Sequence, residues 1–477
     1  MSHPSGINAF VASSNILHRA LTDEPLDIVS GHGCILTLAS GRTIIDGSAG
    51  PAVSCLGHNR PDITAAITTQ LSKIAYVYSG ARFRCEASEA LASFLLREGK
   101  GGLCKAIFVN SGSEATDAAV KLATQYWAER ADGGRRRRFV SRKQSYHGNT
   151  LGALSVSGHA GRRALYRDWV SGNVTFVDPC YKYRGKKLVG GEEKDGGGMR
   201  EESDEAYVQR LKQQLEDEFL RTGPGTVAAF FAETMSGTTL GCAPAVPGYF
   251  KAVREVCDKH GVLLVLDEIM CGMGRTGTMH AWEQEGISGP DIQMIGKGLG
   301  GGFVPLSGVL LNQRVFDGLA HGSKKLMHGH TFQAHPTACA AALAVQHAIV
   351  KESLLSNVLK MGSVLETALR AQLTSLPLVG DIRGRGLFWS VEFVTDKGSK
   401  TPFNESENFS ARVVDRALEL GLNILGNLGN TGEFYVDHVL ISPPYVVCEE
   451  EVVGIVGILK RAVGEVSGEY FASIGVK

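Results

Sequence analysis

Two apolar stretches, VLLVLDE at 262–268 and PDIQMIGKGLGG at 290–301, decide the fold of this sequence. Each is a short run without polar alternation, as expected for strands that helices cover on both faces. Further short apolar runs alternate with helical stretches between residues 104 and 310, which indicates an α/β fold with a mostly parallel sheet. Such folds keep their sites at the carboxyl ends of the strands. We therefore expect Asp267 and Lys297 at adjacent strand ends.

Composition favours a small-molecule function. Lys plus Arg and Asp plus Glu both number 49, so no overall charge attracts nucleic acid or an anionic membrane. No apolar run approaches the length of a bilayer span, and the first residues lack the pattern of a secretory or transit signal. The ten cysteines include no Cys-x-x-Cys pair, which suggests reduced thiols rather than disulfides or a metal site. We expect a cytoplasmic protein that binds neither nucleic acid nor membrane.

The 477 residues predict more than one folding unit. We expect a large domain over 59–341 and a smaller α+β domain built from 1–58 and 342–477. A strand meander is expected around Ser40 and Gly41. The basic run at 133–140 is interpreted as a solvated turn before a strand, and the charged, glycine-rich run at 190–205 as a loop insertion before a helix at 206–221.

Lys297 allows three interpretations. A Walker-type phosphate loop requires Ser or Thr after the lysine, but Gly298 follows it. A Gly-x-Gly-x-x-Gly dinucleotide fingerprint must open a helix, but an apolar run with Pro305 follows here. The third interpretation is a lysine that forms an imine with a pyridine-ring cofactor, whose ring nitrogen needs a buried carboxylate such as Asp267.

A phosphate site is also available in the sequence. The stretch NSGSEATDAAVKLA, 110–123, is a turn that opens a helix, and free N–H groups at a helix N-terminus favour an anion. Ser111 and Glu114 have the spacing of an ordinary helix cap, so this stretch alone is equally consistent with a purely structural role.

Taken together, these motifs resemble the class III pyridoxal-phosphate aminotransferases, the group of ornithine, 4-aminobutyrate and other ω-amino transaminases. Residues 266–310 look like that family's signature almost throughout, and the resemblance extends from LGHNRPDI through NSGSEA, SYHG, GHTFQAHP and DIRGRGLF to ISPPY, over roughly 40–450. It implies the fold type I of pyridoxal-phosphate-dependent transferases, pyridoxal 5'-phosphate as cofactor, and a homodimer with shared active sites.

The resemblance also implies roles for particular residues. Lys297 is expected to form the internal aldimine and to act as base, and Asp267 to pair with the ring nitrogen. The other residues expected to hold the cofactor are Gly112 and Ser113 at its phosphate, Tyr146 and His147 at the ring, Glu233 near the ring hydroxyl, Ile269 against the other ring face, and Thr331 at the phosphate of the neighbouring subunit.

Two departures from the family pattern bear on the substrate. Thr234 stands where the family has proline, which is expected to alter the local turn. Thr238 stands where one branch has a glutamate that pairs with the arginine of RGxGL. We therefore expect Arg383 to lack a counter-ion and to bind a substrate carboxylate, with Arg385 as its solvated neighbour. Tyr78 is expected either in the pocket wall or in the core.

The resemblance implies transamination from an amino acid or amine donor to a 2-oxo acid or aldehyde acceptor. The same cofactor site serves decarboxylating transaminases and aminomutases, which remain the alternative at this point. They differ in which bond lies perpendicular to the cofactor ring, and sequence does not reveal that angle. A nucleotide-binding protein that kept the fold is disfavoured by the intact lysine, aspartate and phosphate turn.

Overall fold

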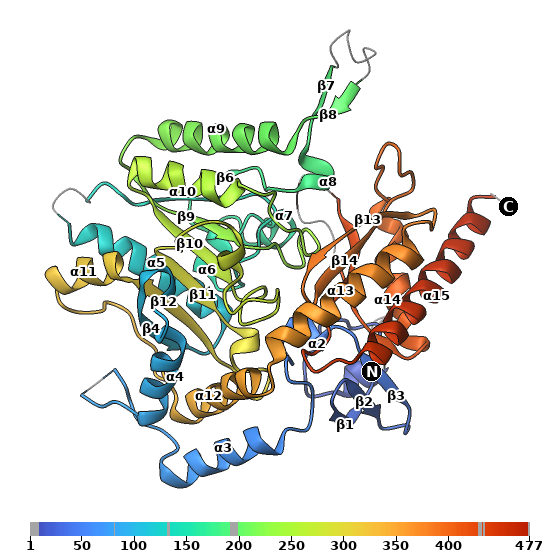
Figure 1. Ribbon diagram of the computed structural model, residues 1–477, viewed down its shortest axis with the longest axis horizontal. Coiled ribbons are helices and arrows are strands. Elements are labelled where there is room, and N and C mark those ends of the chain that lie inside the picture. Colours follow the sequence, from blue (N-terminus) through green and yellow to red (C-terminus); the bar gives the residue numbers. More distant parts are fainter. Residues whose placement is uncertain are drawn as a thin grey trace.

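The structure is a computed structural model of the chain. It describes residues 9–80, 82–130, 134–190, 199–427, 432 and 435–475. A large unit and a smaller one lie side by side, and the amino- and carboxyl-terminal segments come together in the smaller one (Figure 1).

A seven-stranded sheet forms the centre of the large unit (Figure 1). All its neighbouring strands are parallel except around β12, which is antiparallel to both of its neighbours. The predicted mostly parallel sheet is therefore confirmed. In spatial order the strands are β4 Leu103–Val109, β12 Ser307–Asn312, β11 Ile292–Ile295, β10 Leu263–Glu268, β9 Val227–Glu233, β5 Arg138–Arg142 and β6 Val174–Val177.

Helices cover both faces of this sheet. Strand side chains alternate between faces, so Leu263 and Val265 of β10 pack with helix α5, Gly112–Ala128, whereas Leu264 and Leu266 pack with helices α9 and α10 on the other face. Helix α9 spans Asp204–Thr222, and α10 spans Tyr249–His260. Helix α10 ends at Gly261, whose φ of 67° is the left-handed conformation that glycine adopts at low cost.

The smaller unit contains two four-stranded sheets. In the first, β1 Ile28–His32, β2 Ile35–Leu38 and β3 Thr43–Asp46 form the predicted meander, and β15 Leu422–Asn423 joins it beside β3. The second has the order β13 Val379–Arg385, β14 Phe388–Phe393, β17 Asp437–Ile441 and β16 Leu425–Gly426. The chain therefore pairs strands from its two ends.

Four helices complete this part of the molecule: α12 Pro336–Lys351, α13 Leu354–Leu373, α14 Phe409–Glu419 and α15 Glu449–Ser473. Cys34 and Leu56 share a buried cluster with Leu365 and Val456, so the two ends of the chain share one core. The expected domain boundary between 341 and 342 falls inside α12, which is unbroken there.

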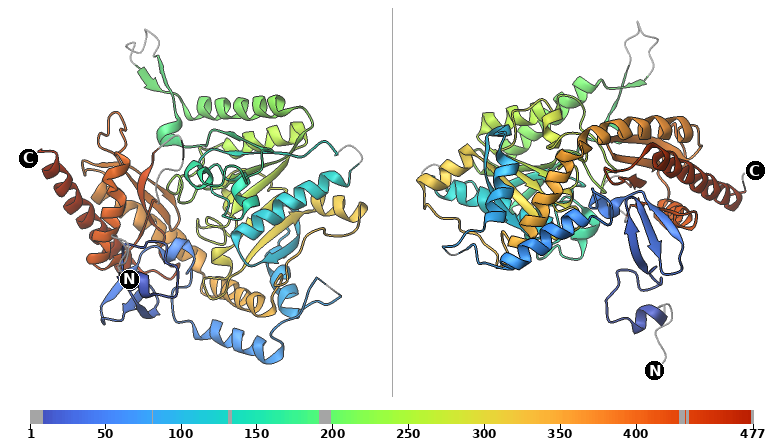
Figure 2. Two further views of the ribbon diagram at one scale, coloured as in Figure 1. Left: turned by 180° about the vertical axis from the view of Figure 1, so that it is seen from behind. Right: turned by 60° about the horizontal axis from the view of Figure 1, so that its bottom comes forward.

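The remaining elements connect these units or lie around them (Figure 2). They are α1 Ala9–Ser13, α2 Ala49–Ala52, α3 Pro61–Lys73, α4 Glu86–Leu96, α6 Leu151–Val156, α7 Ala160–Ala164, α8 Lys182–Gly185, α11 Gln313–His321, β7 Leu188–Gly190, β8 Met199–Glu201, and 3₁₀ turns at Lys100–Gly102, Ala281–Gln284, Lys297–Leu299 and Glu405–Glu407.

The two predicted surface segments can be followed in part. The basic run leads into β5 at Arg138, but residue 133 lies outside the described chain. The charged insertion is framed by the β7–β8 hairpin, and its central residues 191–198 lie outside the described chain. Within the described ranges, no single helix is long and apolar enough to cross a bilayer; α12 and α13 meet that test only jointly, across a 66° bend.

Candidate active site

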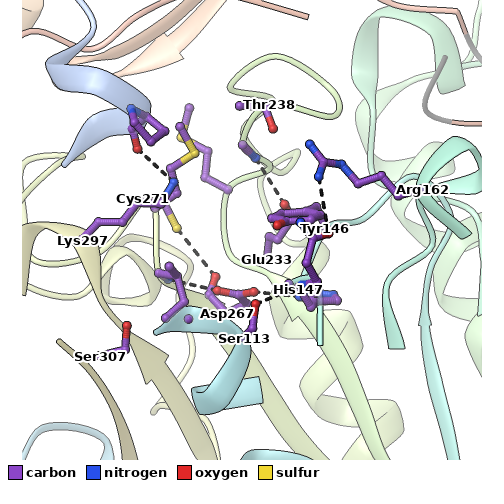
Figure 3. A pocket seen from close by; sticks show the side chains of 18 of the residues that line it. Ser113, Tyr146, His147, Arg162, Glu233, Thr238, Asp267, Cys271, Lys297 and Ser307 are labelled. Atoms are coloured by element: carbon purple, nitrogen blue, oxygen red, sulfur yellow. Dashed lines mark hydrogen bonds and ion pairs between the residues drawn. The ribbon is translucent and has the colours of Figure 1, made fainter. Parts of the chain in front are cut away.

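A cavity of about 610 Å³ opens at the carboxyl edge of the central sheet (Figure 3). It receives side chains from strand ends, from the start of α5 and from loops. The sequence-predicted residues that line it are Gly112, Ser113, Tyr146, His147, Glu233, Asp267, Ile269 and Lys297. The other lining residues include Arg19, Pro51, Gly148, Asn149, Arg162, Met235, Gly237, Thr238, Met270, Cys271, Ser307 and Leu425.

Lys297 stands two residues beyond the end of β11. Its φ of 44° is left-handed, which costs a non-glycine residue about 1–3 kcal/mol and is typical of functional sites. Its Nζ donates a hydrogen bond of 2.9 Å to the carbonyl of Pro51. Burial lowers the Lys297 pKa to about 8. About a tenth of this amine is therefore neutral at pH 7, and the neutral form is the one that a nucleophile or base requires.

Asp267, near the end of β10, is 5% exposed and lies on the floor of the cavity (Figure 3). One carboxylate oxygen accepts a 2.7 Å bond from Nδ1 of His147, and the other accepts a 3.0 Å bond from the backbone N–H of Ile269. His147 is itself buried, with Nε2 3.4 Å from the Ser141 hydroxyl. The carboxylate is therefore held in one orientation.

Glu233 is the last residue of β9 and lies directly opposite Asp267 in the parallel register. Its carboxylate accepts a 3.3 Å bond from the Gly237 backbone and is 3.7 Å from the Arg142 guanidinium. Burial raises the Glu233 pKa. The next residue, Thr234, donates its hydroxyl to Glu268, so the position that departs from the family pattern is tied to β10.

The start of helix α5 supplies the anion-binding end of the cavity. The Ser111 hydroxyl accepts a 3.2 Å bond from the backbone N–H of Glu114, which confirms the predicted helix cap. Gly112 and Ser113 follow it and line the cavity. A Cβ added to Gly112 would be 3.1 Å from Ile269, so a glycine allows the close approach of helix and pocket wall.

Tyr146 and Ile269 provide the apolar surfaces of the cavity. Tyr146 follows β5 in the loop that also carries His147, and Arg162 lies over its ring, with the guanidinium carbon 4.8 Å from the ring centroid (Figure 3). Ile269 lies two residues after Asp267, beside Gly112 and Gly296. A flat group between two such surfaces would have apolar contact on both faces.

Arg383 does not line the cavity, and the expectation that it lacks a counter-ion is wrong. Its Nη1 contacts Asp381 at 2.8 Å and Glu392 at 2.7 Å. Its Nε and Nη2 donate to the carbonyls of Leu240 and Gly241. The guanidinium is thus occupied on every side by the protein, because β14 supplies the carboxylate that Thr238 does not.

Two further predicted residues lie outside the cavity of their own chain. Tyr78 is 49% exposed, so it belongs neither to the core nor to this pocket wall. Thr331 is exposed, and its carbonyl accepts a 2.8 Å bond from the Tyr76 hydroxyl. Arg385, expected to be solvated, instead pairs with Glu285 at 2.8 Å.

Sequence reasoning missed the two arginines of the cavity, Arg19 and Arg162. Arg19 lies in the segment between α1 and β1, and Arg162 lies in the short helix α7. Neither belongs to a motif, and the run GRRALYR around Arg162 reads as an ordinary basic surface. Only their position in the fold identifies them.

Known proteins that are similar in sequence indicate one family. The aminotransferase class-III family profile matches residues 17–463. An aminotransferase from Gibberella zeae is 43% identical over 451 residues, covering 94% of this chain and 85% of that protein. An uncharacterized aminotransferase from Schizosaccharomyces pombe is 42% identical over 448 residues, covering 94% of each chain. The chain therefore belongs to the class-III aminotransferases.

Solved structures agree with this assignment. An amine transaminase from an uncultivated Pseudomonas species, in its PLP-bound form, matches with a TM-score of 0.85 and 31% identity over 98% of each chain. The fold is that of the fold type I transferases that depend on pyridoxal 5'-phosphate, as predicted. The protein is an enzyme that uses this cofactor for transamination.

Proposed function

We propose that the cavity at the carboxyl edge of the sheet binds pyridoxal 5'-phosphate and that its lining residues carry out the transamination. The observation that supports this most directly is that Lys297, Asp267 and the N-terminus of α5 meet on one cavity. An amine, a fixed carboxylate and an anion-binding helix end are the three groups that an aldehyde, a pyridine nitrogen and a phosphate require. The donor set therefore fits the cofactor.

In this proposal Lys297 holds the cofactor covalently through Nζ. When bound, pyridoxal phosphate supplies a carbonyl that takes up an amino group and a ring that stabilises negative charge on the neighbouring carbon. Once its Nζ is free, Lys297 accepts and returns the proton of the substrate carbon. Its pKa of about 8 suits both steps, because the amine loses and regains a proton near neutral pH.

Asp267 keeps the ring nitrogen protonated in this proposal. Its carboxylate is buried, and a charge pair gains far more in a dry site than the roughly 1 kcal/mol at 4 Å that it gains in water. His147 and the Ile269 N–H hold the carboxylate in place. Gly112 and Ser113 bind the phosphate, Tyr146 and Ile269 cover the two ring faces, and Glu233 lies near the ring hydroxyl.

We also propose a homodimer with shared sites, in which Thr331 reaches the phosphate of the partner subunit. The exposure of Thr331, of Phe332 next to it and of Tyr76, whose hydroxyl donates to the Thr331 carbonyl, supports this. The expected mass in solution is twice 50.9 kDa, measured by light scattering. A monomer that turns over substrate would contradict the shared site.

We also propose a division into domains and a location in the cell. We propose that residues 59–341 form the cofactor-binding domain and that residues 1–58 and 342–477 form the second domain. The shared core of the two chain ends supports this division.

We propose a cytoplasmic location. The ten free cysteines support it, because reduced thiols persist in a reducing compartment.

The proposed function is tested with purified enzyme loaded with cofactor. Amine donors are screened against pyruvate and 2-oxoglutarate, and the oxo and amino products are followed together with carbon dioxide. The expected result is bleaching of the visible cofactor band on adding a donor, with equal amounts of oxo and amino product. Release of carbon dioxide in step with the product, or a donor rearranged without an acceptor, would contradict simple transamination.

A further inference from the structure

We propose that Arg162, assisted by Arg19, binds the carboxylate of the amino donor, and that Arg383 does not. The inference rests on the proposed function and adds a substrate class to it. The donor would be an amine that carries a carboxylate at the end of the molecule remote from the reacting amino group.

Arg162 is the half-buried cation of the cavity wall. Its guanidinium lies over the Tyr146 ring, and its Nη1 has a long 3.4 Å contact with the side-chain oxygen of Asn149. No carboxylate pairs with it among the residues that the structure describes. A guanidinium that stacks by its face still has N–H donors along its edge, and these match a carboxylate at two points.

Arg19 adds a second charge to the same wall. Burial raises the pKa of the Tyr146 hydroxyl, and the charges of both arginines oppose that rise, as expected if both lie near the phenol. Arg19 likewise has no acidic partner within the described ranges. The acidic residues of the cavity, Glu233 and Asp267, are engaged at its floor with their own partners. The wall therefore keeps positive charge that no acidic side chain of the described residues neutralises.

In this conformation Arg383 is not free to bind a substrate carboxylate. Glu392, which is fully buried, contacts Arg383 and Arg184 at 2.7 Å each and also accepts the Tyr181 hydroxyl. To bind a substrate carboxylate, Arg383 would have to leave two carboxylates and two carbonyls. Removing one partner from such a buried pair is strongly destabilising, because it leaves an uncompensated buried charge. Arg162 has no comparable contacts to give up.

The position of Arg162 sets the kind of donor. Figure 3 shows Arg162 and Lys297 on opposite sides of the cavity, with Tyr146 and Glu233 between them. An α-amino acid carries its amino and carboxylate groups on one carbon, so these groups cannot reach both sides at once. An ω-amino acid separates them along a chain, and it can present its amino group to Lys297 and its carboxylate to Arg162.

The test compares two donors of equal chain length, 5-aminopentanoate and pentylamine, on the loaded enzyme and on Arg162→Gln. We expect kcat/KM for 5-aminopentanoate to fall about 10- to 100-fold, mainly through KM, because charge-assisted hydrogen bonds are lost. The value for pentylamine, which has no carboxylate, should fall far less, so the ratio of the two values should drop about tenfold or more. Arg162→Lys should recover part of the loss, and Arg19→Gln should show a smaller loss of the same kind.

Arg167→Gln is the matched control, because Arg167 is nearby in sequence but its side chain is 83% exposed and it does not line the cavity. It should leave both donors unaffected. An equal loss for both donors in Arg162→Gln would overturn the proposal, since it would mean that Arg162 acts only by positioning Tyr146. No change for 5-aminopentanoate would also overturn it.

A binding measurement separates this inference from the proposed function. Pentanoate has the carboxylate but no amino group, so it cannot react. Calorimetric titration should show pentanoate binding that Arg162→Gln weakens about tenfold or more. If neither donor loses its amino group on the wild-type enzyme, the proposed function fails, and the pentanoate titration still decides the role of Arg162. Equal pentanoate binding by both proteins would contradict it.

Discussion

The floor and the wall of the cavity are built differently. The floor, with Asp267, His147 and Glu233, comes from the ends of neighbouring strands and their first loops, and its polar groups are bonded to each other or to the backbone. The wall, with Arg162 and Arg19, comes from a short helix and an amino-terminal segment, and its charges lack acidic partners within the described chain.

This difference separates two tasks. A floor whose hydrogen bonds are already made is rigid and holds a cofactor in one orientation. A wall with unneutralised charge leaves its donors for a ligand. Arg383 illustrates the distinction, because it is an arginine whose donors the protein itself occupies. Availability of the donors, rather than residue type, marks a substrate ligand.

The largest effect is expected from the floor. In Asp267→Asn the amide keeps the shape of the side chain but removes the negative charge that favours a protonated ring nitrogen. We expect kcat to fall about a thousandfold or more while cofactor stays bound. Steady-state rates and the cofactor content of the purified variant measure this. Near-normal turnover would contradict the role of Asp267 at the ring nitrogen, and with it the distinction between floor and wall.

Arg383→Gln tests whether Arg383 has a structural role. It leaves Glu392 and Asp381 without one of their cations, and it releases the loop carbonyls of Leu240 and Gly241. We expect a loss of about 3 kcal/mol in unfolding free energy. Urea denaturation measures it, with Arg461→Gln, at an exposed pair on α15, as a control that changes little.

The two donors sharpen this test. If Arg383 has a structural role, any loss of activity in Arg383→Gln should be the same for 5-aminopentanoate and pentylamine. A loss confined to 5-aminopentanoate, in a variant of normal stability, would return the carboxylate-binding role to Arg383.

Lys297 lies across the cavity from Arg162 (Figure 3), and its pKa of about 8 gives a pH dependence. Burial disfavours the charged form, so the neutral amine increases as pH rises toward 8. The rate at which cofactor-free enzyme takes up pyridoxal phosphate should rise about tenfold from pH 6 to 7 and level off above about 8. Stopped-flow absorbance measures this, with a simple alkylamine correcting for titration of the cofactor. A rise that continues past pH 10 would mean an ordinary lysine.

The smallest effect is expected at the start of α5, where neighbouring serines have different tasks. Ser113 lines the cavity, whereas Ser111 caps the helix. Ser113→Ala should weaken cofactor binding about tenfold with little change in stability. Ser111→Ala should cost about 1 kcal/mol of stability with little change in cofactor affinity. Fluorescence titration and denaturation of both variants measure the two effects, and the reverse pattern would contradict the assignment.

The sequence predicted the floor better than the wall for a physical reason. Asp267, Glu233 and Lys297 follow apolar runs, and parallel strands bring the ends of such runs to one edge. Arg162 and Arg19 reach the cavity through tertiary packing, which no local pattern encodes. The same holds for Arg383, since its partner Glu392 arrives through the antiparallel pairing of β13 with β14, where Asp381 lies opposite Glu392.

The site of covalent attachment tests the role of Lys297 most directly. The loaded enzyme is reduced with borohydride, digested and mapped by mass spectrometry, with Lys297→Ala treated in parallel. We expect the cofactor mass on the peptide that contains Lys297 and none on the variant. An active preparation in which the label lies on another lysine, while Lys297 is unmodified, would contradict it.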